Sequence, residues 1–142
     1  MPDPAVLENI SIGDALPERS FEATNVSLFM YNAAVWNHHR IHYDERYTTE
    51  VEKHPGVVID GPLQGDWLSQ VALNWLSDAG QLVRFAYANR RAAYLGEVLT
   101  SGGQVTAVDS ASGLVELDLF IRNEAGDIIT PGSATVRFGA GA

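Results

Sequence analysis

The fold of this chain is decided by residues 57–80, which read VVIDGPLQGDWLSQVALNWLSDAG. The run 57–59 is short, apolar and typical of a strand. Pro62 suits the first turn of a helix, where its missing N–H would have no partner in any case. The broad apolar stripe that follows at helical spacing comprises Leu63, Trp67, Leu68, Val71, Ala72, Trp75 and Leu76. We therefore predict one long apolar helix over 62–79, with Gly80 as the glycine that ends it.

Four further runs follow this helix and are suited to covering it. We predict strands at about 82–90, 94–108, 113–122 and 128–138. In the third run, apolar residues occupy every second position from Val115 to Ile121, as a sheet with one covered face requires. The turn-forming segments 110–113 and 123–126 separate consecutive strands. This order of elements predicts an α+β domain in which an antiparallel meander wraps the long helix.

The residues before the long helix are less regular. Apolar residues at helical spacing occupy Val26, Phe29, Met30, Ala33, Ala34 and Trp36. They predict a helix capped by Thr24 or Asn25. A shorter helix is expected over 44–51, capped by its first residue. The first twenty residues are expected to form an irregular arm, flexible over 1–9 and with one short edge strand near 10–12.

Length and composition indicate one globular domain over residues 1–142. The chain has a mass of 15.4 kDa, and 46% of its residues are hydrophobic and 19% charged. Its formal net charge of −9 disfavours nucleic-acid binding, because a phosphate backbone requires a basic surface. The absence of cysteine excludes disulfides and thiolate chemistry. Neither a membrane-spanning apolar stretch nor a signal-peptide pattern is present in the sequence, so we expect no membrane partner and a cytoplasmic protein.

Three of the four histidines lie within five positions, in the string NHHRIHYD at residues 37–44. Imidazole is the side chain best suited to proton transfer near neutral pH, and a neighbouring amide or carboxylate orients it or a water molecule beside it. This string is therefore the first candidate for a catalytic site. Two alternatives stay open: the histidines are solvated or pack against aromatic rings, or His38, His42 and Asp44 bind a metal. No metal is expected, because no further ligand cluster accompanies the string.

Gly61 lies at the start of the predicted long helix and is the second candidate. Backbone N–H groups at a helix N-terminus stabilise nearby negative charge. Pro62 offers no N–H, which leaves Gly61 as the donor that is approached without a side chain in the way. Aimed at a carbonyl oxygen, such a donor makes an oxyanion hole, and the alternative is an ordinary helix start. The sequence contains no serine-hydrolase elbow, phosphate-binding loop or dinucleotide-binding motif.

Two motifs carry a resemblance to a known family. The first is N-x-x-R-I-H-Y-D over 37–44, directly after a helix, and the second is PGVVIDGPLQ over 55–64. Together they resemble the MaoC-like hot-dog dehydratases, the group of (R)-specific enoyl-CoA hydratases, and are closest to the branch of mesaconyl-CoA-type hydratases and mitochondrial 3-hydroxyacyl thioester dehydratases. Residues 90–97 also fit this family. The resemblance covers about 12–138 and implies a hot-dog fold, an antiparallel sheet wrapped around a central helix.

The resemblance implies reversible addition of water to a 2-enoyl thioester, giving a 3-hydroxyacyl thioester. His42 falls on the family's catalytic histidine, which acts as acid and base on the water. Asn37 falls on the position of the family's catalytic aspartate, and an amide orients water but cannot take its proton. Gly61 falls on the oxyanion glycine, while the histidine that usually precedes it is Asp60 here. An ionised Asp60 would oppose the negative charge that develops on the substrate, unless its side chain points away to cap the helix.

The same resemblance implies where the substrate binds. Gln64, Trp67 and Tyr31 are the candidates for lining the acyl pocket. The candidates for binding the phosphates of coenzyme A are the arginines Arg40, Arg84, Arg90 and Arg91. Coenzyme A enters as part of the acyl-CoA substrate, and no separate cofactor is expected.

Two functions follow from the resemblance. The first is an acyl-CoA hydratase or dehydratase, and the second is a non-catalytic hot-dog subunit that binds acyl-CoA or completes a heterodimeric hydratase. Either function is expected to involve a homodimer or heterodimer, because hot-dog domains of this size cover their sheet edges by pairing. A thioesterase with Asp66 as its helix carboxylate is less favoured, because the histidine string would then have no role.

Overall fold

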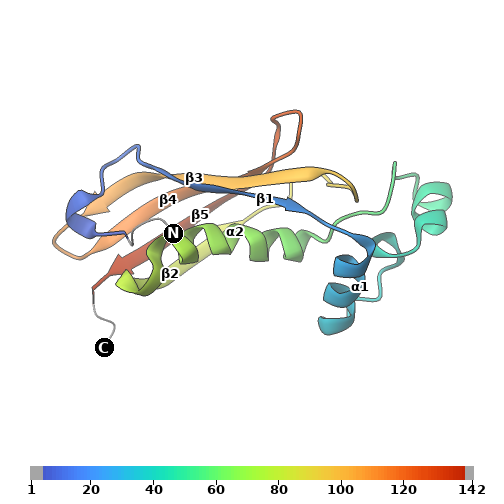
Figure 1. Cartoon of the computed structure of the whole chain (residues 1–142), viewed down its shortest axis with the longest axis horizontal. Helices are drawn as coiled ribbons and strands as arrows, with labels where there is room; N and C mark the ends of the chain where they lie inside the picture. The colour runs from blue at the N-terminus through green and yellow to red at the C-terminus, as the bar shows by residue number, and fades with distance from the viewer. Residues whose placement is uncertain (1–4, 140–142) are drawn as a thin grey trace.

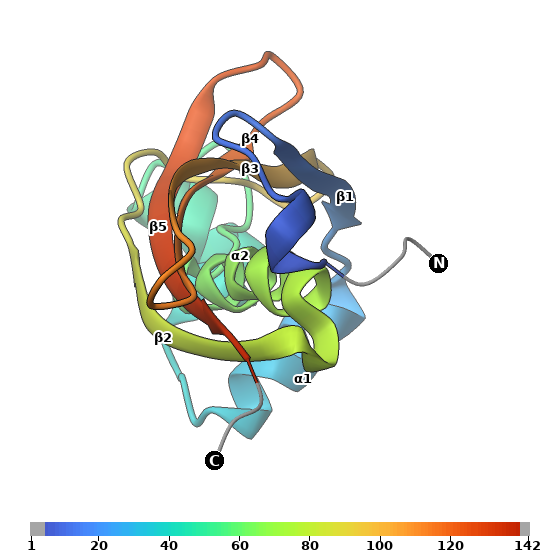
Figure 2. The same ribbon diagram turned by 90° about the vertical axis from the view of Figure 1, so that its left-hand side faces the viewer.

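A computed structural model, which describes residues 5–139, contains a five-stranded antiparallel sheet wrapped around a long helix (Figure 1). The strands are β1 (Ala15–Glu22), β2 (Gly80–Tyr87), β3 (Val98–Asp109), β4 (Leu114–Arg122) and β5 (Ile128–Phe138). The helices are α1 (Asn25–Ala34) and α2 (Gly61–Leu76), with the short helical turns η1 (Leu7–Asn9), η2 (Arg40–His42), η3 (Tyr47–Val51) and η4 (Ser77–Ala79). Seen end-on, the sheet curves around α2 (Figure 2). The predicted α+β hot-dog fold is confirmed.

The core lies between α2 and the concave face of the sheet. Leu68 and Ala72 of α2 are completely buried, and α2 contacts all five strands. In β4, alternate residues from Val115 to Ile121 are buried, as the sequence pattern predicts. Complete burial of one such aliphatic side chain stabilises the fold by roughly 1.5–3 kcal/mol. The sheet therefore holds α2 along its length, and this fixes the position of its first turn.

The strand order is β1-β3-β4-β5-β2, so the predicted meander is present only as β3, β4 and β5. A meander of all four strands would place β2 beside β3, and this is wrong. β2 pairs with β5, in the register Gly80 with Phe138. Gly80 therefore opens a strand, and α2 ends instead at Ser77, which has φ 49°. A Cβ atom at Gly80 would collide with the carbonyl oxygen of Arg137. The close approach of β5 is the reason for glycine at this position.

The N-terminal segment is more ordered than the sequence indicates. Leu7 and Ile10 pack against the core, so residues 5–9 are not a free arm, while the expectation for 1–4 lies outside the described residues. The edge strand expected near 10–12 lies later in the chain: it is β1, which begins at Ala15 and pairs with β3.

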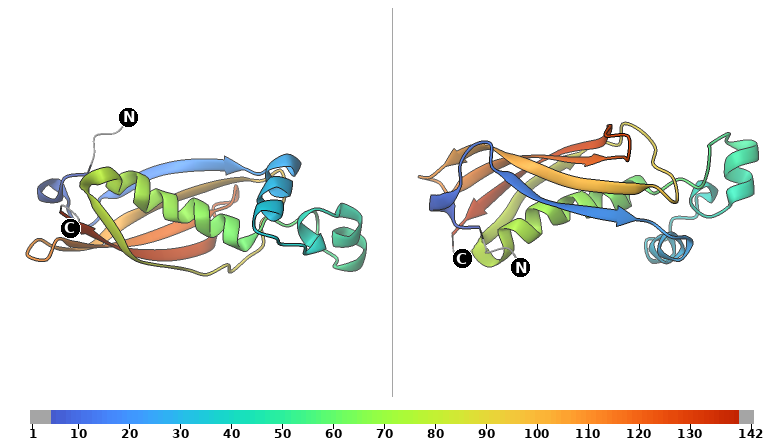
Figure 3. Two further views of the ribbon diagram at one scale, coloured as in Figure 1. Left: turned by 90° about the horizontal axis from the view of Figure 1, so that it is seen from below. Right: turned by 45° about the horizontal axis from the view of Figure 1, so that its top comes forward.

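The helix α1 lies beyond one end of the sheet, beside the first turn of α2 (Figure 3). Its predicted cap is confirmed: Thr24 Oγ1 accepts a hydrogen bond from the Ser27 N–H at 3.1 Å, and Ser27 Oγ accepts from the Thr24 N–H at 2.8 Å. The side chains that α1 buries are Leu28 and Asn32. Its apolar stripe is instead exposed, and comprises Val26 (66% exposed), Phe29 (67%), Met30 (64%) and Trp36 (90%).

Two further elements differ from the predictions. The strand expected at 57–59 contributes only an isolated bridge between Val58 and Tyr94, outside the sheet. β3 begins at Val98, later than predicted. None of the helices in residues 5–139 is both long and apolar enough to cross a bilayer.

Candidate active site

The end of α1 presents Asn37 toward the first turn of α2. The Asn37 N–H donates to the Asn32 carbonyl at 2.9 Å, and the Trp36 N–H donates to the Ala33 carbonyl at 3.4 Å. This pair of bonds is the Schellman ending of a helix, which needs a left-handed residue and usually has glycine there. Trp36 occupies that position with φ 57°. The chain therefore turns sharply, and Asn37 points its amide into the protein.

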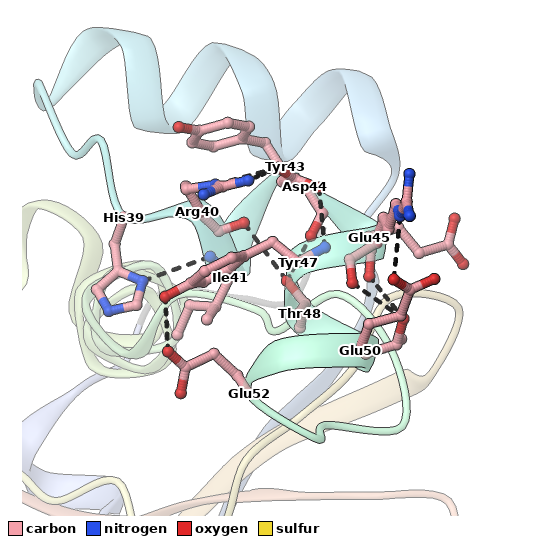
Figure 4. A network of polar contacts seen from close by, with 12 residues as sticks. His39, Arg40, Ile41, Tyr43, Asp44, Glu45, Tyr47, Thr48, Glu50 and Glu52 are labelled. Carbon is pink, nitrogen blue, oxygen red and sulfur yellow. Dashed lines mark hydrogen bonds and ion pairs between the residues drawn. The ribbon is translucent and has the colours of Figure 1, made fainter.

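The turn η2, which carries His42, is held from outside by Asp44. Asp44 Oδ2 accepts from Arg40 Nε and Nη2 at 3.1 and 2.8 Å, and Asp44 Oδ1 accepts from the Tyr47 N–H at 3.0 Å. The Arg40 guanidinium also lies 4.0 Å from the centre of the Tyr47 ring. Figure 4 shows these contacts, together with the bond from the Tyr47 hydroxyl to Glu52 at 2.7 Å. The helix predicted over 44–51 is present as η3 from Tyr47, and Asp44 accepts from its first N–H and at the same time braces η2.

His42 is buried, with 9% of its surface exposed. Its Nδ1 lies 2.8 Å from the carbonyl oxygen of Val58. Because a carbonyl only accepts hydrogen bonds, Nδ1 carries a proton and donates it to this bond. The Val58 N–H in turn donates to the Ile41 carbonyl at 2.9 Å. These two bonds fix the ring of His42 and direct its Nε2 toward the start of α2.

Asp60 lies at that start and is completely buried. Its Oδ1 accepts from Asn32 Nδ2 at 2.9 Å, and its Oδ2 accepts from Asn37 Nδ2 at 3.0 Å. His42 Nε2 lies 3.5 Å from the same Oδ2. The side chain makes no capping bond to α2, so the sequence-based alternative of a helix cap is wrong. The carboxylate points instead into the cluster of Asn32, Asn37 and His42, where two amide donors compensate its charge.

Asn32 has a defined amide orientation in this cluster. Its Nδ2 donates both to the Leu28 carbonyl at 2.8 Å and to Asp60, and both partners are acceptors. In the opposite orientation the amide oxygen of Asn32 would face both of these acceptor oxygens, so the amide cannot be flipped. Its buried Oδ1 has no hydrogen-bond partner among the described residues.

Gly61 follows Asp60 and is the first residue of α2, so its N–H has no acceptor within the helix. Gly61, His42, Gln64 and Arg90 all line one hollow of about 280 Å³. A Cβ atom at Gly61 would collide with the side-chain amide of Asn89, which lies against it. Gly61 and His42 therefore line the same space.

Of the predicted substrate-binding residues, Gln64 and Arg90 line this hollow, and Tyr31 and Trp67 do not. Gln64 is buried, and its Oε1 accepts from the Thr130 hydroxyl at 2.6 Å. Burial raises the pKa of the Tyr31 hydroxyl, and the charges of Asp66 and Asp60 raise it further, so Tyr31 stays protonated at neutral pH. The Trp67 ring stacks on Phe21 of β1 with centroids 4.7 Å apart.

A second hollow, of about 430 Å³, lies on the other side of the cluster, beneath α1. It is lined by Phe29, Asn32, Ala33, Trp36, Asn37, His38 and Tyr43. The carboxamides of Asn32 and Asn37 thus separate an apolar depression from the hollow that contains Gly61. The cluster around Asp60 lies between the two.

The arginines expected to bind coenzyme A differ in their surroundings. Arg40 pairs with Asp44, and Arg91 Nη1 pairs with Asp127 at 3.1 Å. Arg84 Nη1 donates to the Ser133 hydroxyl at 3.2 Å. Arg90 lines the hollow beside Gly61, on the segment that follows β2. Within residues 5–139, no three His, Asp or Glu side chains are grouped as metal ligands.

Comparison with known proteins shows the family. Residues 7–95, more than half of the chain, match the family model of hydroxyacyl-thioester dehydratase type 2. The chain belongs to this dehydratase family. Over 72 residues, or 51% of its length, this family member is 36% identical to the mesaconyl-C(4)-CoA hydratase of Chloroflexus aurantiacus. The matched stretch covers only 25% of that relative.

Solved structures share the fold of this type 2 dehydratase relative. The (R)-hydratase from A. caviae involved in PHA biosynthesis superposes with a TM-score of 0.84 and 15% identity, over 93% of this chain and 99% of that one. A MaoC-like dehydratase superposes with a TM-score of 0.87 and 21% identity, over 97% of this chain and 43% of that one. The predicted MaoC-like hot-dog family is therefore confirmed.

Sequence reasoning missed two members of the site. Asn32 is a polar residue placed between the apolar positions of α1, and a buried polar side chain of this kind signals a specific partner. Asn89 is signalled by nothing local, because its contact with Gly61 depends on how the segment after β2 returns to the start of α2.

Proposed function

We propose that this chain catalyses the reversible addition of water to a 2-enoyl-CoA, giving a 3-hydroxyacyl-CoA. Membership of a hydroxyacyl-thioester dehydratase family supports this class of reaction. The observation that carries the proposal is that His42 and Gly61, whose N–H has no acceptor within α2, line one hollow of about 280 Å³. A proton-transferring ring and an oxyanion donor facing a common space are the two groups that this reaction needs.

In the proposed reaction, the thioester oxygen accepts a hydrogen bond from the Gly61 N–H. The oxygen of a water molecule bonds to C3 while His42 Nε2 takes one of its protons. The π electrons of the C2=C3 bond move into the thioester, and the resulting enolate is stabilised at Gly61, an effect of about 3 kcal/mol for one such donor. The proton on Nε2 then passes to C2, which completes the hydration and returns His42 to its starting form.

The surroundings of the hollow support an acyl-CoA as substrate. Arg90 lies at the hollow and supplies positive charge for the phosphates of coenzyme A, while Gln64, which also lines the hollow, is placed beside the acyl group. Asn37 lines the hollow beneath α1 and not that of Gly61, so in this proposal it contributes through its bond to Asp60 and does not orient the water directly. Trp67 would have to leave its stack with Phe21 to reach the acyl group, so this proposal does not place it in the acyl pocket.

The test is loss of the ultraviolet absorbance of the conjugated enoyl thioester when the protein is mixed with crotonyl-CoA. We expect turnover by the wild type and a decrease of roughly 10²- to 10⁴-fold in kcat for His42→Ala, with the melting temperature little changed. The matched control is His54→Ala, which removes the histidine outside the string and should keep the wild-type rate. Wild-type turnover by His42→Ala would exclude His42 as the acid and base.

A second candidate function is a non-catalytic hot-dog subunit, which binds acyl-CoA or completes the site of a heterodimer. The exposed apolar face of α1, formed by Val26, Phe29, Met30 and Trp36, favours it, because a second chain would cover such a surface. The same face is compatible with a homodimer in the enzyme. A folded protein that turns over neither crotonyl-CoA nor a branched or dicarboxylic enoyl-CoA, but is retained by immobilised acyl-CoA, would favour the second candidate over the first.

A further inference from the structure

The buried carboxylate of Asp60 is the one ionisable group in the cluster that the proposed reaction does not use. It is completely buried, yet it does not cap α2, the helix that begins beside it. An isolated buried charge is costly unless it is paired and hydrogen-bonded. The partners of Asp60 therefore indicate why this position holds an acid.

Two of those partners are amide donors whose orientation is fixed. Each carboxylate oxygen accepts one amide N–H, from Asn32 at 2.9 Å and from Asn37 at 3.0 Å. Asn32 cannot be reversed, because its Nδ2 also donates to the Leu28 carbonyl. The Oδ1 of Asn37 accepts from the His39 N–H at 3.1 Å, so its Nδ2 must face Asp60. Both asparagines thus present donors to a carboxylate.

The third contact is with His42, whose Nε2 lies 3.5 Å from Oδ2 of Asp60. Nδ1 of His42 donates to the Val58 carbonyl, so the lone pair of the neutral ring is on Nε2. A proton that reaches Nε2 gives the ring a positive charge at ion-pair distance from the carboxylate. The contact is therefore strongest once the ring has taken a proton.

We propose that Asp60 is the positioning residue of the acid–base centre: held by Asn32 and Asn37, its buried carboxylate orients Nε2 of His42 and stabilises the imidazolium that forms during the reaction. This inference rests on the proposed hydratase function. Asn37 cannot itself supply the charge, because an amide does not ionise. The negative charge thus comes from residue 60, one residue before the oxyanion donor Gly61, and the charge is directed away from that donor toward His42.

The proton balance of the reaction follows from this arrangement. As the water oxygen bonds to C3, its proton moves to Nε2 of His42, and Asp60 compensates the new positive charge without itself gaining a proton. The same proton then leaves Nε2 for C2 of the substrate. Asp60 is completely buried and touches His42 but not the hollow, so it acts through the ring and not on the water directly.

The contact between Asp60 and Asn37 makes an exchange experiment possible. Asp60→Asn removes the charge with little change of volume, and we expect kcat with crotonyl-CoA to fall roughly 10²-fold or more while KM changes less than about threefold. In the double variant Asn37→Asp, Asp60→Asn, the amide at 60 donates to the carboxylate at 37, which returns a charge beside His42. We expect this variant to recover at least about tenfold of the lost kcat. Asp78→Asn, an exposed residue of η4 at the far end of α2, is the matched control and should keep the wild-type kcat.

The outcomes separate the two hypotheses. If the wild type hydrates crotonyl-CoA and Asp60→Asn does so at an equal rate, the role of Asp60 is wrong and the hydratase function stands. If the wild type hydrates no enoyl-CoA, the function is wrong, and nitrogen NMR of the His42 ring at neutral pH decides the role of Asp60. The inference then predicts that the resonance of Nε2 changes between the wild type and Asp60→Asn, because Nε2 is the ring nitrogen beside the carboxylate. Identical ring spectra for the two proteins would overturn it. If Asp60→Asn does not fold, kcat and the nitrogen spectrum of the His42 ring are measured in the double variant Asn37→Asp, Asp60→Asn instead.

Discussion

Arg40 reaches across the turn that carries His42 and binds Asp44 through two nitrogens, with Nε and Nη2 at 3.1 and 2.8 Å from Oδ2. Asp44 also holds the Tyr47 N–H, so one carboxylate joins η2 to η3. The polar ends of the string RIHYD thus support the histidine in its middle. Their role is to fix a turn, and the turn fixes His42 against Val58.

Replacing Asp44 should therefore disturb the reaction from outside the site. We expect Asp44→Ala to lower kcat with crotonyl-CoA by roughly tenfold or more, because small displacements of a catalytic ring are costly. Glu50→Ala is the control: it breaks the exposed i, i+4 pair with Arg46 at 3.0 Å on the same surface and should leave kcat unchanged. Equal rates for the two variants would show that the bracing of η2 does not matter to the reaction.

Acid should loosen the same segment. The Tyr47 N–H, and after it the Arg40 guanidinium, hold the pKa of Asp44 below its ordinary value of 3.8. Because the pKa is lower in the folded protein, the stabilisation is complete above pH 3.8 and is lost as the pH falls through the folded-state value. We expect the hydrogen-exchange protection factor of the Tyr47 amide to decrease over this range. In Asp44→Asn the protection factor should be lower and independent of pH there.

Gly61 is expected to tolerate no side chain, because a Cβ atom there would collide with Asn89. This steric effect can be separated experimentally from the proposed role of the Gly61 N–H as the oxyanion donor. Gly61→Ala brings a Cβ atom into the Asn89 side chain, whose Cγ would lie at 3.0 Å, and the start of α2 must shift. We expect kcat to fall at least about tenfold. The double variant Gly61→Ala, Asn89→Ala removes the obstacle and should regain part of the rate. No recovery would place the defect in the backbone N–H itself.

The stability of the fold should depend on the buried face of α2. Leu68 is completely buried, and its Cδ2 would lie 2.7 Å from a Cβ atom at Gly132 of β5. We expect Leu68→Ala to lower the free energy of unfolding by about 2–5 kcal/mol in urea denaturation. Leu73→Ala makes the same change on the outer side of the helix, where the side chain is 44% exposed, and should cost less than about 1 kcal/mol.

Replacing Trp36 by glycine should stabilise the folded protein. A left-handed conformation costs a residue with a Cβ atom roughly 1–2 kcal/mol, and the greater freedom of glycine in the unfolded chain offsets roughly 0.4–1 kcal/mol of the gain. We therefore expect Trp36→Gly to raise the free energy of unfolding of the monomer by about 0.5–1 kcal/mol in urea. A lower value would show that the indole, although 90% exposed, contributes more than the strain costs.

The parts of the fold that local rules govern were predictable from the sequence. The cap at Thr24, the start of α2 around Pro62 and the alternation from Val115 to Ile121 each depend on neighbours in the chain, and each is confirmed. Pairings between distant segments were not predictable in this way. β2 and β3 are consecutive in the chain, yet β2 lies beside β5, and β3 lies between β1 and β4.

The candidate site shows the same difference between what local motifs predict and what contacts between distant residues decide. His42 and Gly61 were identified from motifs, and both line one hollow. The direction of the Asp60 side chain was not, because it is decided by Asn32, which lies 28 residues earlier, and by Asn37. The apolar residues of α1 show the reverse problem: their helical period is real, but periodicity does not say whether a face meets the sheet, a second chain or solvent.

The pairing of β2 with β5 also bears on how the protein assembles during synthesis. The ribosome releases α2 and β2 well before β5, the strand that lies between β2 and β4. Until β5 emerges, β2 has no neighbour in the sheet and the apolar side of α2 is only partly covered. Pairings of such long sequence separation form slowly and expose apolar surface to aggregation. We therefore expect nascent chains that stop before residue 128 to depend on chaperones, although every residue of the candidate site has already been synthesised.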